Sequence, residues 1–486
     1  MTTPAAPWCN WSDTQRVYAK HIERPASLAA LQEIVRDVSG RQGRLKPVAT
    51  GLSFSDILQS DDTLVEMTGL LGEPSAGALL PLESELFRQS SRTPLVRIPC
   101  GARIRSLNAA LASAGLGFTN LGGYDAQTFV GAVSTSTHGS GANIPPLSDG
   151  VRSLDVLLAD GSVLRLEPNH GVTDPDKFAH RYGATRRLVQ NDEWFWSVVV
   201  SLGCMGIILS VVVAVSPAYR LLERRKLSTW VDVQRAIDGG VLDRVRNYEV
   251  LVNPYRRRDG HYSCLVTERW VAHPEQPRVP LPPERRSAES LTFLATSQGA
   301  VVAAMNSDPR IIPAFLEFGL GVLQTGPEHH LEDSAVIYNI GKINTAHVIS
   351  GEYFFPVAGY RAAIEALFHA VDRNRKRGVH QPAPFSLRFV SGSRAPLSMA
   401  RRERHCAIEI AAFKDLHRAA ETLLEYERVC IAMKGRPHWA QSHELTGQPQ
   451  WLAAAYPDVA IWQRARQALD PRGLFSNHFT DRLGLS

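Results

Sequence analysis

Apolar residues recur three and four positions apart from Leu28 onward, which is the spacing of an amphipathic helix. Ser27 precedes this pattern and Gly40 follows it, so the sequence predicts a capped helix that ends around Gly40. A strand is expected at residues 44–48. Small and hydroxyl side chains then predominate in residues 49–56. Such a loop lets the backbone approach a ligand closely.

The order of strand, helix and small-residue loop recurs further along the chain. Residues 96–98 predict a strand, and residues 105–114 predict a helix that ends at Gly115. The loop that follows, within residues 120–141, is rich in Gly, Ser and Thr and almost free of bulky side chains. Residues 156–166 then indicate a hairpin, because two apolar runs are joined by a two-residue Asp-Gly turn.

Residues 194–217 contain no charged side chain and are long enough to cross a membrane. However, Gly203 and Gly206 lie in the middle of this stretch, and a burst of β-branched residues follows them. This pattern favours a helix, a turn and a buried strand. No stable insertion into a membrane is therefore expected.

Composition and charge place the chain among ordinary globular proteins. Its 486 residues are 44% hydrophobic and 21% charged, and at about 100–200 residues per domain this length allows two to four domains. A formal net charge of +5 is too weak to indicate binding to nucleic acid. The six cysteines show no C-x-x-C spacing, which argues against both a zinc knuckle and a disulfide framework. Since residues 1–20 lack a signal peptide, a reduced, cytoplasmic setting is expected.

Two loops of Gly, Ser and Thr suggest one large phosphate-containing ligand, because backbone N–H groups and hydroxyls reach a phosphate there without steric hindrance. The alternative is that both loops are merely turns. Neither G-x-G-x-x-G nor G-x-x-x-x-G-K-[ST] occurs, so a Rossmann or P-loop site is not supported. His438 and His443 lack the spacing and the Glu of a zinc-protease helix, and no metal site is expected.

A series of short motifs runs in order along the chain. They are Asn10-Trp11-Ser12, residues 51–56, Asn120-Leu121-Gly122, Gln127-Thr128, residues 137–141, Ser201-Leu202-Gly203, Glu352-Tyr353, Leu387-Arg388-Phe389, Arg436-Pro437-His438-Trp439 and residues 470–477. With these motifs the chain resembles, over nearly its full length, the aldonolactone and alditol oxidases, which are flavoproteins of the vanillyl-alcohol oxidase superfamily.

The resemblance implies an α+β fold with a PCMH-type FAD-binding domain of two subdomains and an inserted α+β substrate cap. Residues 1–217 are expected to form the FAD-binding domain and residues 218–433 the cap. Residues 434–486 are expected to return to the FAD-binding domain.

The resemblance also implies a set of cofactor-binding residues. They are Thr50, Gly51, Leu52, Ser53, Phe54, Ser134, Thr135, Ser136, Thr137, His138, Gly139, Ile207, His438 and Asn477. The two loops would wrap the pyrophosphate and ribityl chain of FAD, Ile207 would line the dinucleotide, and His438 would lie near the isoalloxazine. Many family members carry a flavin-linked histidine where this chain has Leu52, so FAD is expected to be bound non-covalently.

The expected substrate pocket departs from the family pattern. The family usually has a Glu two residues before the cap arginine, a His twenty-one residues after it and a Lys two residues after the P-H-W tryptophan. This chain has Ser386, Glu409 and Gln441 at those positions and retains Arg388. Thr128 occupies a position where the family has a small hydroxyl residue near flavin and substrate. These five residues are the candidate catalytic set.

Hydride removal from an alcohol needs a base for the hydroxyl proton and a positive group or donor beside the reduced flavin. Glu409 is the candidate base, and Arg388 or His438 would supply the stabilisation. An ion pair between Glu409 and Arg388 is an equally good interpretation of the carboxylate.

The resulting hypothesis is an FAD-dependent oxidoreductase acting on a small polar substrate, a modified sugar or secondary metabolite, with molecular oxygen or another electron acceptor. The alternative is a flavin-binding protein that has lost its redox chemistry and serves as a ligand-binding module.

Overall fold

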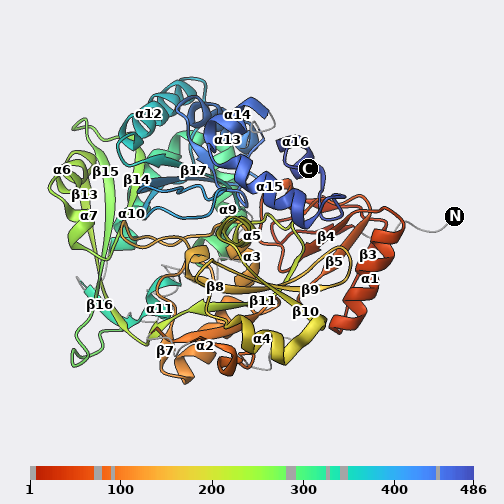
Figure 1. The fold of residues 1–486 in the computed structure, drawn as a ribbon. Helices are drawn as coiled ribbons and strands as arrows, with labels where there is room; N and C mark the ends of the chain where they lie inside the picture. The colour runs from red at the N-terminus through yellow and green to blue at the C-terminus, as the bar shows by residue number, and fades with distance from the viewer. Residues whose placement is uncertain are drawn as a thin grey trace.

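The computed structural model describes residues 7–70, 79–88, 93–280, 292–324, 329–339, 348–444 and 449–486. These residues pack around two hydrophobic cores (Figure 1). The first core belongs mainly to residues 7–217 and 438–486, here called the first unit, and the second to residues 218–437, here called the cap unit. Helices and sheets are mixed in both units, so the predicted α+β class is confirmed.

The first unit contains a parallel three-stranded sheet in the order β3-β5-β4 and a mixed five-stranded sheet in the order β10-β9-β8-β11-β6. Its strands are β1 (Trp8–Cys9), β2 (Arg16–Val17), β3 (His21–Glu23), β4 (Leu45–Val48), β5 (Thr63–Glu66), β6 (Leu95–Pro99), β7 (Leu116–Gly117), β8 (Val151–Leu157), β9 (Val163–Glu167), β10 (Arg186–Gln190), β11 (Ile207–Ala214) and β12 (Ser216–Pro217). Its helices before the cap unit are α1 (Leu28–Gly40), α2 (Ile104–Ser113), α3 (Phe129–Ser134), α4 (Pro175–Tyr182) and α5 (Asp192–Val199).

Local patterns in this unit fold as predicted. Helix α1 begins after Ser27, whose Oγ accepts a hydrogen bond from the Ala30 N–H at 3.2 Å. The uncharged stretch forms helix α5, a turn and strand β11. Because β11 lies between β8 and β6 inside the sheet, its apolar side chains are buried in protein.

The cap unit is built on an antiparallel eight-stranded sheet in the order β16-β13-β15-β14-β18-β19-β17-β20. Its strands are β13 (Arg220–Thr229), β14 (Asn247–Arg256), β15 (Tyr262–Val271), β16 (His329–Asp333), β17 (Val348–Pro356), β18 (Phe385–Val390), β19 (His405–Phe413) and β20 (Arg436–Pro437). Its helices are α6 (Trp230–Asp238), α7 (Val241–Arg244), α9 (Thr292–Ser307), α10 (Ile312–Gln324), α11 (Ser334–Tyr338), α12 (Tyr360–Lys376) and α13 (Ala419–Ala432). Helices α6, α10, α12 and α13 contact the strands of this sheet, and the sheet lies beside the first unit (Figure 1).

After β20 the chain packs against the first unit. Its last helices are α14 (Pro449–Ala455), α15 (Val459–Leu469) and α16 (His478–Leu483). Helix α15 contacts α5, and Trp462 Nε1 donates a hydrogen bond to the Val200 carbonyl at 2.9 Å. Helix α16 contacts the short helical turn at residues 56–58. Both ends of the chain therefore contribute to one unit, and the cap is inserted between them.

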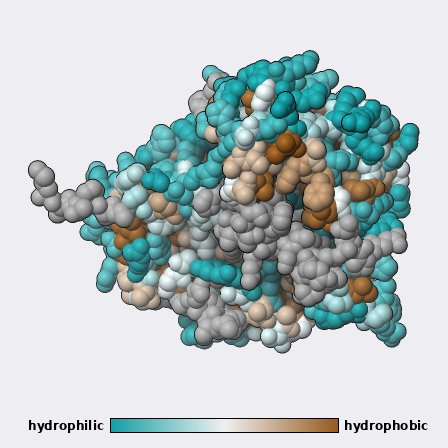
Figure 2. All heavy atoms as spheres, turned by 180° about the vertical axis from the view of Figure 1, so that it is seen from behind, coloured by the Kyte–Doolittle hydropathy of each residue, from teal (hydrophilic) through white to brown (hydrophobic). Residues whose placement is uncertain are grey.

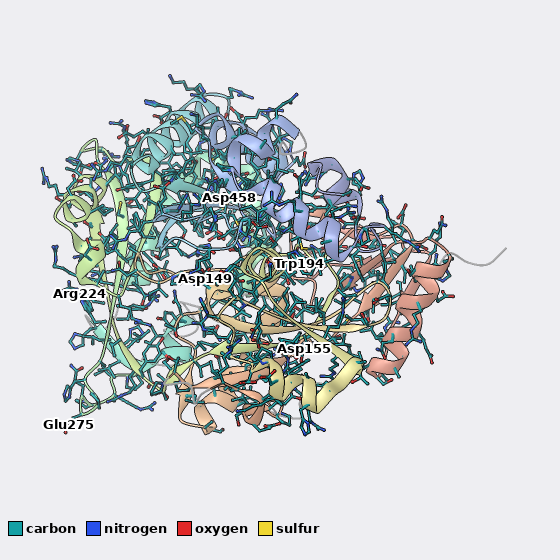
Figure 3. All side chains as sticks on the ribbon, viewed as in Figure 1. Asp149, Asp155, Trp194, Arg224, Glu275 and Asp458 are labelled. Carbon is teal, nitrogen blue, oxygen red and sulfur yellow. The ribbon has the colours of Figure 1, made fainter. Side chains whose placement is uncertain are left out.

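Residues 391–404 of the cap unit are fixed to the first unit from two sides. Ser393 Oγ donates a hydrogen bond to Asp149 Oδ2 at 2.6 Å, and Arg401 Nε donates one to Asp458 Oδ2 at 2.7 Å. Figure 3 places Asp149 and Asp458 in the middle of the molecule, where the two units meet. These bonds hold the cap sheet in a defined position beside the first unit.

The surface is largely hydrophilic on the face shown in Figure 2, and the apolar residues there form small groups. The large apolar side chains that are exposed include Tyr18, Leu227 and Phe318, which lie far apart in the sequence. None of the helices in the described ranges combines the length with the apolar composition that crossing a bilayer requires.

Candidate functional site

A hollow in the first unit opens to solvent, and it contains about 920 Å³ of space that protein atoms do not fill when the solvent at its mouth is included. Three segments supply most of its wall: residues 46–53, residues 127–137 and residues 201–208. Of the predicted site residues, those that line it are Thr50, Gly51, Leu52, Ser53, Thr128, Ser134, Thr135, Thr137 and Ile207. The two loops identified in the sequence therefore meet at one cavity.

The backbone of these loops adopts conformations that few residues tolerate. Gly51 has φ +65°, and a Cβ at this position would lie 2.6 Å from the Trp8 ring. Ser136 at φ +58° and Leu202 at φ +55° are left-handed although neither is glycine. Such conformations concentrate at functional sites. The Ser136 hydroxyl lies 2.8 Å from Ser398 Oγ and is therefore engaged with the cap unit.

Phe54 and Asn477 lie outside the wall of the hollow and act on it through neighbours. The Phe54 N–H donates a hydrogen bond to the carbonyl of Ala440, which lines the hollow, at 2.7 Å. In the same way, Asn477 Nδ2 donates to the carbonyl of Ile57, another lining residue, at 3.0 Å. Ser55 Oγ donates to the Trp439 carbonyl, 384 positions away, at 2.7 Å. The C-terminal segment thus fixes the first loop.

The donors around the hollow fit an anionic dinucleotide such as FAD. Thr50 and Ser53 lie in the wall, and their hydroxyls match the polyol and phosphate oxygens of that cofactor. Lys46 adds a buried ammonium group to the same wall. Apolar residues such as Leu52 and Ile207 complete the wall and suit the flat rings.

A charged cluster lies on neighbouring strands of the cap sheet. Arg388 on β18 donates through Nη1 to Glu409 on β19 at 2.8 Å and to Glu352 on β17 at 3.2 Å. Glu409 also accepts a hydrogen bond from Ser350 Oγ at 3.1 Å. Ser386 lies directly opposite Glu409 across the strand pair. The structure therefore brings three of the predicted catalytic residues together and establishes the ion pair between Arg388 and Glu409.

His138 connects this cluster to the loop that lines the hollow. Its Nδ1 lies 2.8 Å from the Gly139 carbonyl oxygen, and its Nε2 lies 3.2 Å from Glu352 Oε2. Burial alone would raise the pKa of Glu352, but His138, Arg388 and His438 outweigh it and lower this pKa to about 2. His138 therefore joins the loop to the charged cluster through contacts of both ring nitrogens.

His438 belongs to the same cluster. Burial lowers its pKa to about 4, so the ring is neutral at pH 7. Nδ1 accepts a hydrogen bond from the Ala440 N–H at 3.1 Å, which places the proton on Nε2. The possible ligand atoms of His138, Glu352 and His438 lie within 4.8 Å of one another. A protonated Nε2 has no lone pair for a metal ion, so this geometry favours a hydrogen-bonding site.

Two further polar side chains, those of Gln441 and Tyr124, belong to the surroundings of this cluster. Gln441 Oε1 is buried and has no hydrogen-bond partner among the described residues. Tyr124 comes from the 120–127 loop of the first unit, and burial together with the charge of Glu409 raises its pKa above the ordinary value. Its phenol therefore remains a hydrogen-bond donor at neutral pH.

Neither Tyr124 nor Glu352 was among the predicted site residues. Glu352 was part of a recognised motif, but its central position between Arg388 and His138 follows only from the sheet register. Tyr124 stood in a loop noted for its small residues, so a single aromatic ring there gave no distinct signal.

Comparisons with known proteins agree with this arrangement. Residues 211–483 match the family model for D-arabinono-1,4-lactone oxidase, and residues 19–167 match that for an FAD binding domain. An L-gulono-1,4-lactone dehydrogenase of Mycobacterium tuberculosis is 26% identical over 487 residues, 98% of each chain. An alditol oxidase of a Streptomyces species is 25% identical over 474 residues, 97% of each chain.

The fold is shared with solved structures of low sequence identity. A cholesterol oxidase from B. sterolicum aligns with a TM-score of 0.76 at 14% identity, over 98% of this chain and 96% of that one. The lactone oxidase model alone covers more than half of the sequence. The chain therefore belongs to the D-arabinono-1,4-lactone oxidase family and is an FAD-dependent oxidoreductase.

Proposed function

We propose that this oxidoreductase removes a hydride from the CH–OH carbon of a small polar substrate bound between the hollow and the cap sheet. The observation that carries the proposal is the cluster of Arg388, Glu409 and Glu352, which lies beside the loop that lines the hollow. When bound, FAD supplies the hydride acceptor and passes the electrons to molecular oxygen or another acceptor.

Glu409 is the proposed base for the substrate hydroxyl. Its side chain is 18% exposed, which leaves a path for a ligand, and Ser350 and Arg388 fix its two oxygens. Removing the hydroxyl proton makes the carbon a better hydride donor. Arg388 orients this carboxylate through the contact at 2.8 Å.

His438 and Arg388 are the proposed donors beside the flavin ring. The His438 Nε2 proton has no partner that is described elsewhere in the site, and the ring itself is neutral. A neutral donor and a nearby guanidinium both favour negative charge on the flavin. Thr128, which lines the hollow and also caps α3, is proposed to contact the substrate side of the cavity.

The pocket supports a substrate other than a simple aldonolactone or alditol. Ser386 and Glu409 are direct cross-strand partners, and such side chains lie about 5 Å apart. The carboxylate that the family pattern places at position 386 is thus supplied from position 409, on the neighbouring strand. Because the carboxylate lies one strand away from its position in the family pattern, the hydroxyl of the substrate must also lie in a different place. A modified sugar or secondary metabolite is therefore the proposed substrate class.

The proposal is tested by mixing the oxidised protein anaerobically with panels of modified sugars, polyols and lactones. Loss of the flavin absorbance near the visible maximum is the expected result with at least one CH–OH donor. If dithionite bleaches the flavin but no alcohol in any panel does, hydride removal from alcohols is excluded for the compounds tested and the binding-module alternative gains.

We further propose that FAD is held without a covalent bond. Leu52 lines the hollow at the position expected for the flavin-linked histidine, and its aliphatic side chain has no nucleophilic atom. Acid precipitation is expected to release the yellow cofactor into the supernatant. A yellow pellet would contradict this.

A further inference from the structure

Lys46 is a buried cation in the wall of the hollow. It lies on strand β4, immediately before the first loop, and only 2% of its surface is exposed. Nζ donates a hydrogen bond to the Leu202 carbonyl at 2.7 Å. An ammonium group has three protons to donate, and this single neutral acceptor uses one of them.

No carboxylate among the described residues compensates the charge of Lys46. The only titratable group that acts on it there is Cys204, and burial raises the pKa of that thiol to about 12, so it is neutral. Arg466 and Asp470 influence Cys204 from the C-terminal segment without pairing with Lys46. An uncompensated buried ammonium destabilises the fold. The protein nevertheless keeps this charge beside a cavity that must accept an anionic cofactor.

The Lys46 ammonium lies against Gly203, which lines the same hollow. A Cβ at this glycine would lie 3.1 Å from Lys46 Nζ, which is closer than ordinary van der Waals contact. Gly203 itself has φ +71°, next to Leu202. A residue without a side chain at position 203 thus avoids crowding the cation.

We propose that Lys46 is the cation that binds the diphosphate group of FAD. The proposal concerns the cofactor and does not depend on which alcohol the enzyme oxidises. The bond to Leu202 fixes the ammonium and the turn at residues 201–203 together, so one side chain couples the wall formed by β4 to the wall before β11. The remaining protons are directed to phosphate oxygens, as expected for a lysine at a phosphate site.

The test measures cofactor binding in the absence of substrate. One measurement follows the release of FAD from the diluted holoenzyme, and a second follows the displacement of bound FAD by ADP or by adenosine. Lys46→Met is expected to lower the affinity for FAD and for ADP about ten- to a hundredfold and to leave the affinity for adenosine unchanged. Lys46→Arg keeps the charge and is expected to remain within about threefold of the wild type. Lys177→Met is the matched control, because Lys177 Nζ likewise donates to a carbonyl, that of Phe87, at 2.8 Å but outside the hollow.

A purely structural role for Lys46 gives a different result. If the side chain only holds the Leu202 turn, Lys46→Met lowers the affinities for adenosine and for ADP by the same factor, and the proposal is wrong. Should Lys46→Met purify without a folded core, Lys46→Arg and the pH dependence of the wild type still decide the question.

The pH dependence uses the unmodified protein. Burial lowers the pKa of Lys46 to about 8 when no anion is bound. Because only the protonated form attracts phosphate, FAD affinity should be constant below pH 8 and fall about tenfold by pH 9. In Lys46→Met the affinity should not change over this range. A flat profile in the wild type would overturn the proposal.

Discussion

Two buried clusters of arginine and carboxylate lie in this protein, and they differ in how completely their bonds are satisfied. In the five-stranded sheet, Asp155 accepts hydrogen bonds from Arg97 and Arg165, and both of its oxygens are engaged. In the cap sheet, Arg388 contacts Glu352 and Glu409 through the same nitrogen, Nη1. Its other nitrogens have no partner that the described residues provide.

This difference in hydrogen bonding indicates that the cluster around Asp155 stabilises the fold, whereas the cluster around Arg388 is available for chemistry. Figure 3 places Asp155 among the strands of the first unit, away from the cap sheet, and Asp155 is 4% exposed. In the cap-sheet cluster, by contrast, Glu409 remains partly exposed, and nearby Gln441 Oε1 has no hydrogen-bond partner in the part of the chain that the structure describes. A buried ion pair alone is weak evidence for function. Unused donors and acceptors beside a cavity are the stronger signal.

The largest expected effect is on stability and comes from breaking the first cluster. Asp155→Asn leaves Arg97 and Arg165 without their shared charge and is expected to lower the free energy of unfolding by about 3–5 kcal/mol, measured by urea denaturation. Burial raises the pKa of Asp155, but Arg165 and Arg97 outweigh it and hold this pKa below its ordinary value. The carboxylate therefore stabilises the fold above about pH 4 and loses this contribution as the pH falls further, so the difference between variant and wild type should shrink at pH 3. If Asp155→Asn leaves the free energy of unfolding unchanged but abolishes substrate oxidation, the cluster around Asp155 is the chemical one and this interpretation is wrong.

The next effect is on substrate oxidation and comes from the second cluster. Arg388→Met is expected to slow reduction of the flavin by the best substrate about 10²–10³-fold, because a fixed positive donor beside the reacting groups is lost. Stopped-flow absorbance under anaerobic conditions measures this rate. Arg165→Met is the matched control: it should lower stability and leave the rate per folded molecule unchanged. Equal rates for Arg388→Met and the wild type would remove Arg388 from the catalytic set.

Glu409→Gln separates catalysis from positioning within the second cluster. As a base, Glu409 should contribute about a hundredfold to the rate of flavin reduction. If the rate persists while the affinity for the ligand falls, Glu409 only positions the substrate and the ligand-binding module becomes the better interpretation. Ser350→Ala, which removes one hydrogen bond to Glu409, serves as the milder control.

The smallest expected effect comes from adding a charge at Gln441. Gln441→Lys places a cation where the family pattern has one, and it should raise the reduction potential of the flavin by about 30 mV, the equivalent of tenfold for a two-electron couple. Potentiometric titration with a reference dye measures the shift. A lowered potential would show that position 441 does not face the electron-rich edge of the flavin.

Local parts of the fold were predictable because short-range chemistry determines them. The helix after Ser27 and the succession of α5, turn and β11 follow from capping, glycine and β-branched residues. The order of the eight strands in the cap sheet is different, since β13 and β16 are neighbours although β16 begins 100 residues after β13 ends. Local sequence patterns do not predict pairing between strands that are so far apart in the chain. Only the family resemblance led us to expect a cap.

The site shows the same division. The small-residue loops were visible in the sequence and do line the hollow. The pairing of Arg388 with Glu409 remained open until the register of β18 and β19 was known. Lys46 was not predicted at all, because a lysine in a strand is ordinarily exposed and its burial depends on the distant Leu202 turn.

The hydrogen bonds from Phe54 and Ser55 to Ala440 and Trp439 also constrain the order of events during synthesis. The segment that holds the first loop is translated 384 residues after the loop itself. Cofactor capture must therefore wait until this later segment has been made, and a nascent chain that stops before it would contain both main sheets of the first unit while retaining an open, unfinished flavin cavity.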